Sequence, residues 1–240
     1  MRFLTARWEN LVLLNYVCPP ALLEPLVPRG TALDSWNGDT LVSLVGFLFS
    51  DTRLLGVPIP LHRTFEEVNL RFYVRGPAPD HRRAVVFIRE LVPRRAIAAV
   101  ARRVYNEPYL ALPMRHRWSL TAGEGGEVSY GWSHEGAEFE LGARASGPAR
   151  PLTVGSEAEF VTEHYWGYTR QRDGGTLEYQ VEHPRWRVWT AADSWFSGPA
   201  TALYGPAFGA LLAAPPTSAF LAVGSPVVVH HGRRLAEHRG

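Results

Sequence analysis

Lysine is absent from this chain of 240 residues, so every one of its 25 Lys and Arg side chains is an arginine. Arginine stays protonated at neutral pH and cannot serve as an amine nucleophile. Schiff-base chemistry on a lysine side chain, as used by some decarboxylases and aldolases, is therefore excluded for this sequence. The amine of Met1 is the one formal exception.

Sulfur is also scarce, with one cysteine and two methionines. Cys18 alone cannot form an internal disulfide, and a thiolate metal cluster is excluded as well. The first residues lack the apolar core of a signal peptide, because Arg7 and Glu9 interrupt them. No stretch reaches the roughly 20 apolar residues of a membrane span. We therefore expect a cytoplasmic protein without a membrane partner.

Charge of either sign is not in excess, since the formal net charge is only +2. The arginines are spread along the chain, whereas nucleic-acid binding favours a dense basic stripe, so we expect no nucleic-acid partner. His-Glu-x-x-His and comparable metal spacings are missing, as are Gly-x-Gly-x-x-Gly, the P-loop and the nucleophile elbow. Without these motifs we expect no metal site, no nucleotide cofactor and no other cofactor.

Short apolar or alternating segments dominate what is present. The pattern predicts one helix over 93–106, where Ile97, Val100 and Val104 form an apolar stripe, a short helix from Ser156 and a weak helix over 200–214. The predicted strands are 41–49, 67–75, 84–92, 115–121, 127–134, 137–145, 165–172, 176–183, 187–190, 219–223 and 227–231. Many strands with few helices indicate a mainly β fold, a closed or nearly closed antiparallel barrel, in a single domain over 1–240.

The clearest strand carries a column of polar side chains. Glu67, Asn69, Arg71 and Tyr73 fall on one face, and apolar residues from Val68 to Val74 alternate with them. If this face lines a cavity, Arg71 would clamp an anionic group through its guanidinium fork, Asn69 and Tyr73 would contact the ligand, and Glu67 would act as a base. The other reading is the ordinary solvent face of an antiparallel strand.

Six segments in consistent order resemble the YqjF-like family of uncharacterised proteins, within the acetoacetate decarboxylase-like superfamily. The segments are Phe3-Leu-Thr-Ala-Arg-Trp8, Leu33-Asp-Ser-Trp-Asn-Gly38, Val42-Ser-Leu-Val-Gly-Phe47, Phe65-Glu-Glu-Val-Asn-Leu-Arg-Phe-Tyr-Val74, Val86-Phe-Ile-Arg-Glu90 and Tyr105-Asn-Glu-Pro-Tyr109. The resemblance implies a mainly antiparallel β-barrel with a central cavity, in which the decarboxylases hold glutamate and arginine.

The resemblance breaks at the catalytic element of the decarboxylases. There a helix is followed by Pro-Lys-Lys, and one lysine forms a Schiff base with a β-keto acid. The matching element here is Glu107-Pro108-Tyr109-Leu110, in which Tyr109 and Leu110 replace the two lysines. Tyr109 would donate a hydrogen bond to a ligand oxygen or simply fill space, and Glu107 would point inward or into solvent.

A second alternating segment offers His116 and Trp118 on one face. If His116 faces the cavity, it would transfer protons near neutral pH beside a ligand-contacting Trp118. The alternative is a packed, hydrogen-bonded histidine on the barrel wall. Neither residue belongs to a metal motif.

The leading hypothesis is a cavity that binds a compact, oxygenated, anionic small molecule, with Glu67, Tyr109 and His116 as candidates for acid/base steps. A non-catalytic sensor or carrier is the second hypothesis. A structural or interaction protein, whose barrel is filled by its own aromatic side chains, is the third. The sequence leaves the oligomeric state open, including a homo-oligomer.

Overall fold

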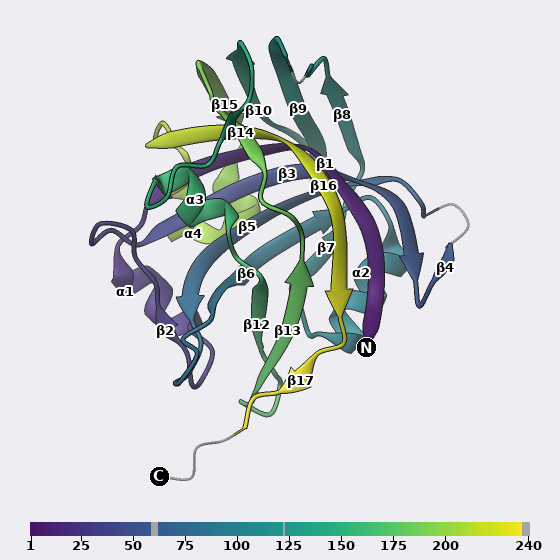
Figure 1. Ribbon diagram of the computed structural model, residues 1–240, viewed down its shortest axis with the longest axis vertical. Helices are drawn as coiled ribbons and strands as arrows, with labels where there is room; N and C mark the ends of the chain where they lie inside the picture. The colour runs from purple at the N-terminus through teal and green to yellow at the C-terminus, as the bar shows by residue number, and fades with distance from the viewer. Residues whose placement is uncertain (59–61, 122, 237–240) are drawn as a thin grey trace.

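The computed structural model describes residues 1–58, 62–121 and 123–236, and these form two β-sheets with four α-helices (Figure 1). Seven strands of the larger sheet form a ring that closes where β13 pairs with β16. In ring order they are β1 (Arg2–Val17), β3 (Leu41–Leu54), β5 (Phe65–Arg75), β6 (Arg83–Val92), β12 (Trp166–Arg170), β13 (Thr176–Glu182) and β16 (Ser218–His230). Neighbours pair antiparallel, except for β6 with β12. The mainly β prediction is confirmed.

The second sheet has four strands and packs on the outside of the ring against β1 and β3 (Figure 1). Its order is β15 (Asp193–Ser197), β10 (Ala137–Ser146), β9 (Gly125–His134) and β8 (Met114–Trp118). Gly46 of β3 lies directly beneath the Tyr130 ring of β9, where an added Cβ would be 2.6 Å from Tyr130 Cδ2. The two sheets therefore share a close-packed core.

Short elements complete the fold. The helices are α1 (Pro20–Leu23), α2 (Arg95–Val104), α3 (Glu157–Thr162) and α4 (Ala200–Leu212), with a 3-10 turn at Glu24–Leu26. The short strands are β2 (Ala32–Leu33), β4 (Val57–Pro58), β7 (Tyr109–Ala111), β11 (Arg150–Pro151), β14 (Arg187–Thr190) and β17 (Arg233–Arg234). Within the described ranges, each helix is too short or too polar to cross a bilayer.

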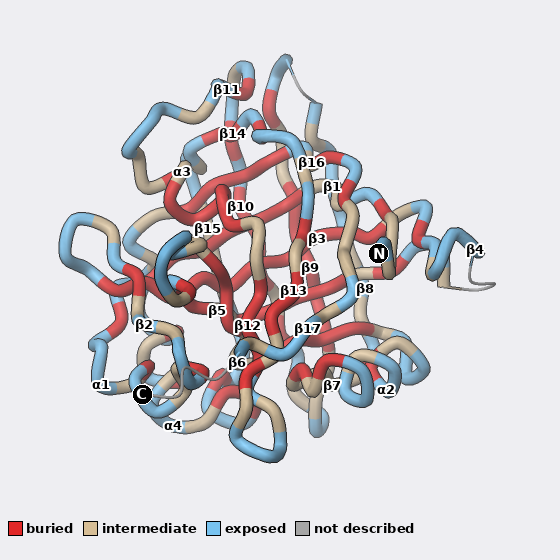
Figure 2. Tube along the Cα trace, turned by 60° about the horizontal axis from the view of Figure 1, so that its bottom comes forward, coloured by how far each residue is buried: buried red, intermediate tan, exposed pale blue. Residues whose placement is uncertain are grey.

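Both faces of β5 are buried, which explains its polar column. Val68, Leu70, Phe72 and Val74 face outward into the core shared with the second sheet. The opposite face points into the ring, where Glu67, Asn69 and Tyr73 are only 3%, 2% and 1% exposed. Figure 2 shows the ring strands as largely buried tubes. The solvent-face reading of this column is therefore wrong.

The structure differs from the predicted elements chiefly in β1 and β16. No strand was predicted over Arg2–Val17, although it is the longest in the described part of the chain. The two strands predicted at 219–223 and 227–231 are one continuous strand that passes through Gly224. Gly224 has a φ of +93°, and a Cβ there would lie 1.9 Å from the carbonyl oxygen of Trp8. Only glycine fits this close approach, so the residue bends the strand without ending it.

A β-bulge in β6 changes which side chains point into the ring. Leu70 pairs with Arg89, but the next residue, Arg71, pairs with Phe87, so Ile88 is the extra residue. Because strand side chains alternate, one extra residue reverses the faces beyond it. Phe87 before the bulge and Glu90 after it both face the cavity for this reason.

Candidate functional site

The ring encloses a cavity of about 330 Å³, with walls that are mostly apolar. Residues Ala96, Ile97, Val100 and Ala101 of α2 cover one side of it. Ten aromatic side chains line the space, namely Phe3, Trp8, Phe49, Phe65, Phe87, Tyr105, Tyr109, Trp166, Tyr179 and Trp186. The volume is near the lower end of the roughly 300–1,000 Å³ range of small-molecule sites.

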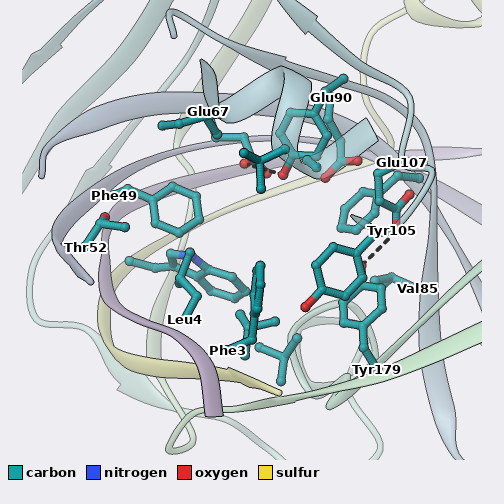
Figure 3. A pocket seen from close by; sticks show the side chains of 18 of the residues that line it. Phe3, Leu4, Phe49, Thr52, Glu67, Val85, Glu90, Tyr105, Glu107 and Tyr179 are labelled. Atoms are coloured by element: carbon teal, nitrogen blue, oxygen red, sulfur yellow. Dashed lines mark hydrogen bonds between the residues drawn. The ribbon is translucent and has the colours of Figure 1, made fainter. Parts of the chain in front are cut away.

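Three buried glutamates lie together on one wall of this cavity. Glu67 comes from β5, Glu90 from β6, and Glu107 from the turn between α2 and β7. Figure 3 shows their carboxyl groups side by side, across the cavity from Phe3 and Leu4. We call Glu67, Glu90 and Glu107 the carboxyl cluster.

Hydrogen bonds hold two members of the carboxyl cluster firmly. Tyr109 donates its hydroxyl to Glu67 Oε2 at 3.0 Å, and Asn69 donates its amide to Glu67 Oε1 at 3.1 Å. Strand register aligns these groups, because Asn69 is opposite Glu90 on β6 and Glu90 is opposite Tyr109 on β7.

Glu107 is held from the other side of the ring. Its Oε1 accepts hydrogen bonds from Tyr179 at 3.0 Å and from Thr169. Glu90 differs, because its buried Oε2 has no partner among the described residues.

Burial raises the pKa of all three glutamates, because an apolar environment disfavours the charged form. It raises the pKa of Glu67 to about 7, although Asn69, Tyr109 and the charge of Arg71 act in the opposite direction. The pKa of Glu107 rises to about 8, against the hydrogen bonds from Thr169 and Tyr179. For Glu90 the pKa rises well above its usual value, through burial and then through repulsion from Glu107 and Glu67. Burial therefore favours the neutral form of the carboxyl cluster, while Glu67, with a pKa of about 7, populates both protonation states near neutral pH.

Arg71 lines the same cavity. It follows Glu67 by four residues on β5, so it lies farther along the strand than the carboxyl cluster. One of its terminal nitrogens donates to the Val161 carbonyl at 2.9 Å, which ties α3 to the ring. The buried Nε has no partner among the described residues. Arg71 thus both holds α3 against the ring and places a positive charge on the cavity wall.

Three histidines also line the cavity, namely His62, His164 and His183. His164, just after α3, is 7% exposed, and neither ring nitrogen has a hydrogen-bond partner in the described part of the chain. Burial, followed by the charges of Arg83, Arg71 and Arg75, lowers its pKa well below the usual value. His183 donates from Nδ1 to the Pro184 carbonyl at 3.0 Å and stacks on Trp186 with ring centres 4.5 Å apart.

The structure brings some of the predicted site residues together and separates others. Glu67, Arg71, Glu107 and Tyr109 line one cavity, whereas Asn69 and Tyr73 are buried behind its wall and support it. The Tyr73 hydroxyl shares a 2.5 Å hydrogen bond with Ser43 instead of facing the cavity.

The expectation that His116 and Trp118 reach the cavity is wrong. Both belong to β8 in the second sheet, where His116 Nδ1 lies 2.7 Å from Glu66 Oε1 and Trp118 is 53% exposed. Alternation on β8 was read correctly, but nothing in the sequence shows that this strand leaves the ring.

Glu90 and His164 are cavity residues that the sequence patterns did not identify. Glu90 was hidden because the bulge at Ile88 shifts its face. His164 stands in a short connection after α3, where no alternation predicts its direction. Among the described residues, no group of three or more His, Cys, Asp or Glu side chains has a geometry that could hold a metal ion.

The ring, the second sheet and the enclosed cavity define a protein with the acetoacetate decarboxylase-like fold. An acetoacetate decarboxylase-like enzyme from Sphingomonas wittichii RW1 superposes with a TM-score of 0.69 and 13% identity, covering 99% of this chain and 95% of that one. The enduracididine biosynthesis enzyme MppR, in complex with pyruvate, gives a TM-score of 0.70 at 15% identity, with 98% and 91% covered. These identities support a shared fold alone.

The chain belongs to the family DUF2071, described as an uncharacterized conserved protein, whose model matches residues 5–227. The uncharacterized protein YqjF of Bacillus subtilis (strain 168) is 26% identical over 188 residues, which are 77% of this chain and 74% of the relative. The family resemblance drawn from the six ordered segments is confirmed, and the implied acetoacetate decarboxylase-like fold is present.

Proposed function

We propose that this protein binds a small, largely apolar molecule that carries an oxygen-containing anionic group, and that it moves protons on that molecule. The observation that carries the proposal is the carboxyl cluster inside a mostly apolar cavity, with Arg71 on the same wall. A carboxyl whose pKa is about 7, as for Glu67, suits a general base near neutral pH. Since the chain has no lysine, the chemistry proceeds without a side-chain imine.

The simplest reaction of this kind is enolisation of a 2-oxo acid. The Glu67 carboxylate takes the proton from C3, and the electron pair of the C–H bond forms the C2–C3 double bond. The carbonyl oxygen takes a proton from Glu90, which burial keeps protonated. The product is the enol, and return of the protons restores the starting molecule and the two glutamates.

Phenylpyruvate is a suitable probe, because it joins a 2-oxo acid to an aromatic ring that matches the aromatic wall. The likeness in fold to a protein crystallised with pyruvate favours this class of head group. In D₂O, the wild-type protein should accelerate exchange of the C3 protons, followed by proton NMR. Glu67→Gln should lower the accelerated rate at least about a hundredfold, the usual scale of general-base catalysis.

Glu66→Gln is the matched control, because Glu66 is adjacent on β5 but bonds to His116 outside the cavity. This variant should exchange at the wild-type rate. Binding of phenylpyruvate without accelerated exchange would favour the carrier or sensor hypothesis instead. Failure to bind phenylpyruvate or any related oxo acid would count against a ligand cavity of this class.

A further inference from the structure

The cavity has a second polar region, formed by Arg71 and His164, and the acid/base proposal assigns no role to His164. Arg71 Nε and both ring nitrogens of His164 are buried without hydrogen-bond partners among the described residues. Trp8 also lines the cavity, and its indole Nε1 is likewise buried without a hydrogen-bond partner among the described residues. Buried polar groups without partners are unfavourable, so they mark positions where a bound molecule would complete the hydrogen bonding.

Arg71 and His164 both lie at the C-terminal end of α3. Arg71 donates to the Val161 carbonyl, and Tyr73 donates to the same oxygen at 3.5 Å. The His164 ring lies against the Tyr73 ring, with centres 4.6 Å apart, and follows Val161 by three residues. The C-terminal end of α3 therefore fixes both side chains against the same patch of cavity wall.

The two polar regions have opposite bonding character. The carboxyl cluster offers oxygen atoms and protons bound to them, whereas Arg71, His164 and Trp8 offer nitrogen donors. An anion beside the carboxyl cluster would meet repulsion from any ionised member, but beside Arg71 it gains a charged donor. A single ligand that uses both regions must carry different groups at its two ends.

We infer that His164 is a second anchoring residue, which together with Arg71 binds the carboxylate of the ligand and so selects oxo acids over neutral ketones. This inference rests on the proposed function, because it concerns the same cavity. The neutral imidazole donates from one nitrogen to a carboxylate oxygen, and the guanidinium of Arg71 supplies the charge. The carbonyl carbon and its neighbour then extend toward Glu67 and Tyr109.

Two probes with the same aromatic body separate the inference from the proposed function. Phenylpyruvate carries a carboxylate beside the ketone, and 1-phenylpropan-2-one carries a methyl group in its place. Calorimetric titration of the wild-type protein should show at least about tenfold tighter binding of phenylpyruvate. His164→Phe keeps a ring against Tyr73 but removes both nitrogens, and it should reduce this preference about tenfold, the scale of one hydrogen bond to a charged group.

The neutral ketone supplies an internal control for folding, because its affinity should be unchanged in His164→Phe. His164→Gln restores a donor and should recover part of the preference, and His116→Phe, outside the cavity, should leave both affinities unchanged. Equal binding of the two probes to the wild type, or a preference that survives His164→Phe, would overturn the inference while the cavity proposal stands. If neither probe binds, the proposed function fails and the inference fails with it.

Discussion

At the scale of single residues, Glu67 is distinctive because opposing effects act on its pKa. Burial raises its pKa, while Asn69, Tyr109 and Arg71 stabilise the charged form. These effects leave the pKa of Glu67 at about 7, so both protonation states are populated at neutral pH. A residue that gives and takes protons needs such a balance. Tyr109 is one of the groups that lower the pKa of this glutamate, through its hydrogen bond.

Tyr109→Phe should therefore raise the pKa of Glu67 above about 7, because the variant loses the hydrogen bond to Glu67 Oε2. Hydrogen bonds to charged groups contribute about 1.5–3 kcal/mol, so the expected rise is on the order of one unit. NMR titration of ¹³C-labelled glutamate carboxyl carbons measures it directly. Tyr179→Phe is the matched control, since Tyr179 bonds to Glu107 instead. An unchanged Glu67 midpoint in Tyr109→Phe would contradict this role.

At the scale of elements, the alternation of β5 and the amphipathic stripe of α2 were readable from the sequence. Helix α2 spans Arg95–Val104 inside the predicted 93–106, and Ser156 caps α3 by accepting from the Glu159 amide. These features depend on local spacing, which the sequence contains. Whether the polar side of β5 faced water or a cavity depended on the second sheet, which covers the other side. No local pattern reports such a contact.

The same limit explains the misplaced and missed site residues. The bulge at Ile88 leaves no mark in composition, yet it decides that Glu90 and not Arg89 faces the cavity. His116 alternates correctly on β8, but the strand joins the second sheet through pairing with β9. Strand partners far apart in sequence determine both outcomes. Consequently, the sequence supported Glu67, Arg71, Glu107 and Tyr109 as neighbours but could not supply Glu90 or His164.

At the scale of the whole molecule, the fold buries acidic groups and so raises their pKa values. For Glu107 the pKa is about 8 in the folded protein against 4.5 for an ordinary glutamate. A raised folded-state pKa gives stability that is complete below pH 4.5 and is lost as the pH rises through about 8. The carboxyl cluster thus destabilises the empty protein in alkaline solution.

Glu107→Gln should make the free energy of unfolding less dependent on pH between 4.5 and about 8. Glutamine keeps an oxygen acceptor for Tyr179 and Thr169 and has no charge to lose, so the difference between the two proteins should grow with pH to a few kcal/mol. Urea unfolding across this range measures that difference. His164 acts oppositely, since its lowered pKa removes stability below about pH 6.5, but it is present in both proteins and cancels. A difference that stays constant with pH would contradict the raised pKa.

The central claim is that the polar side of β5 faces a cavity in which burial raises the pKa of the carboxyl groups. The most direct measurement is the NMR titration of the Glu67 carboxyl carbon in the wild-type protein, assigned by comparison with Glu67→Gln. The account predicts a midpoint near pH 7. A midpoint near 4.5, the value of a glutamate in water, would contradict it.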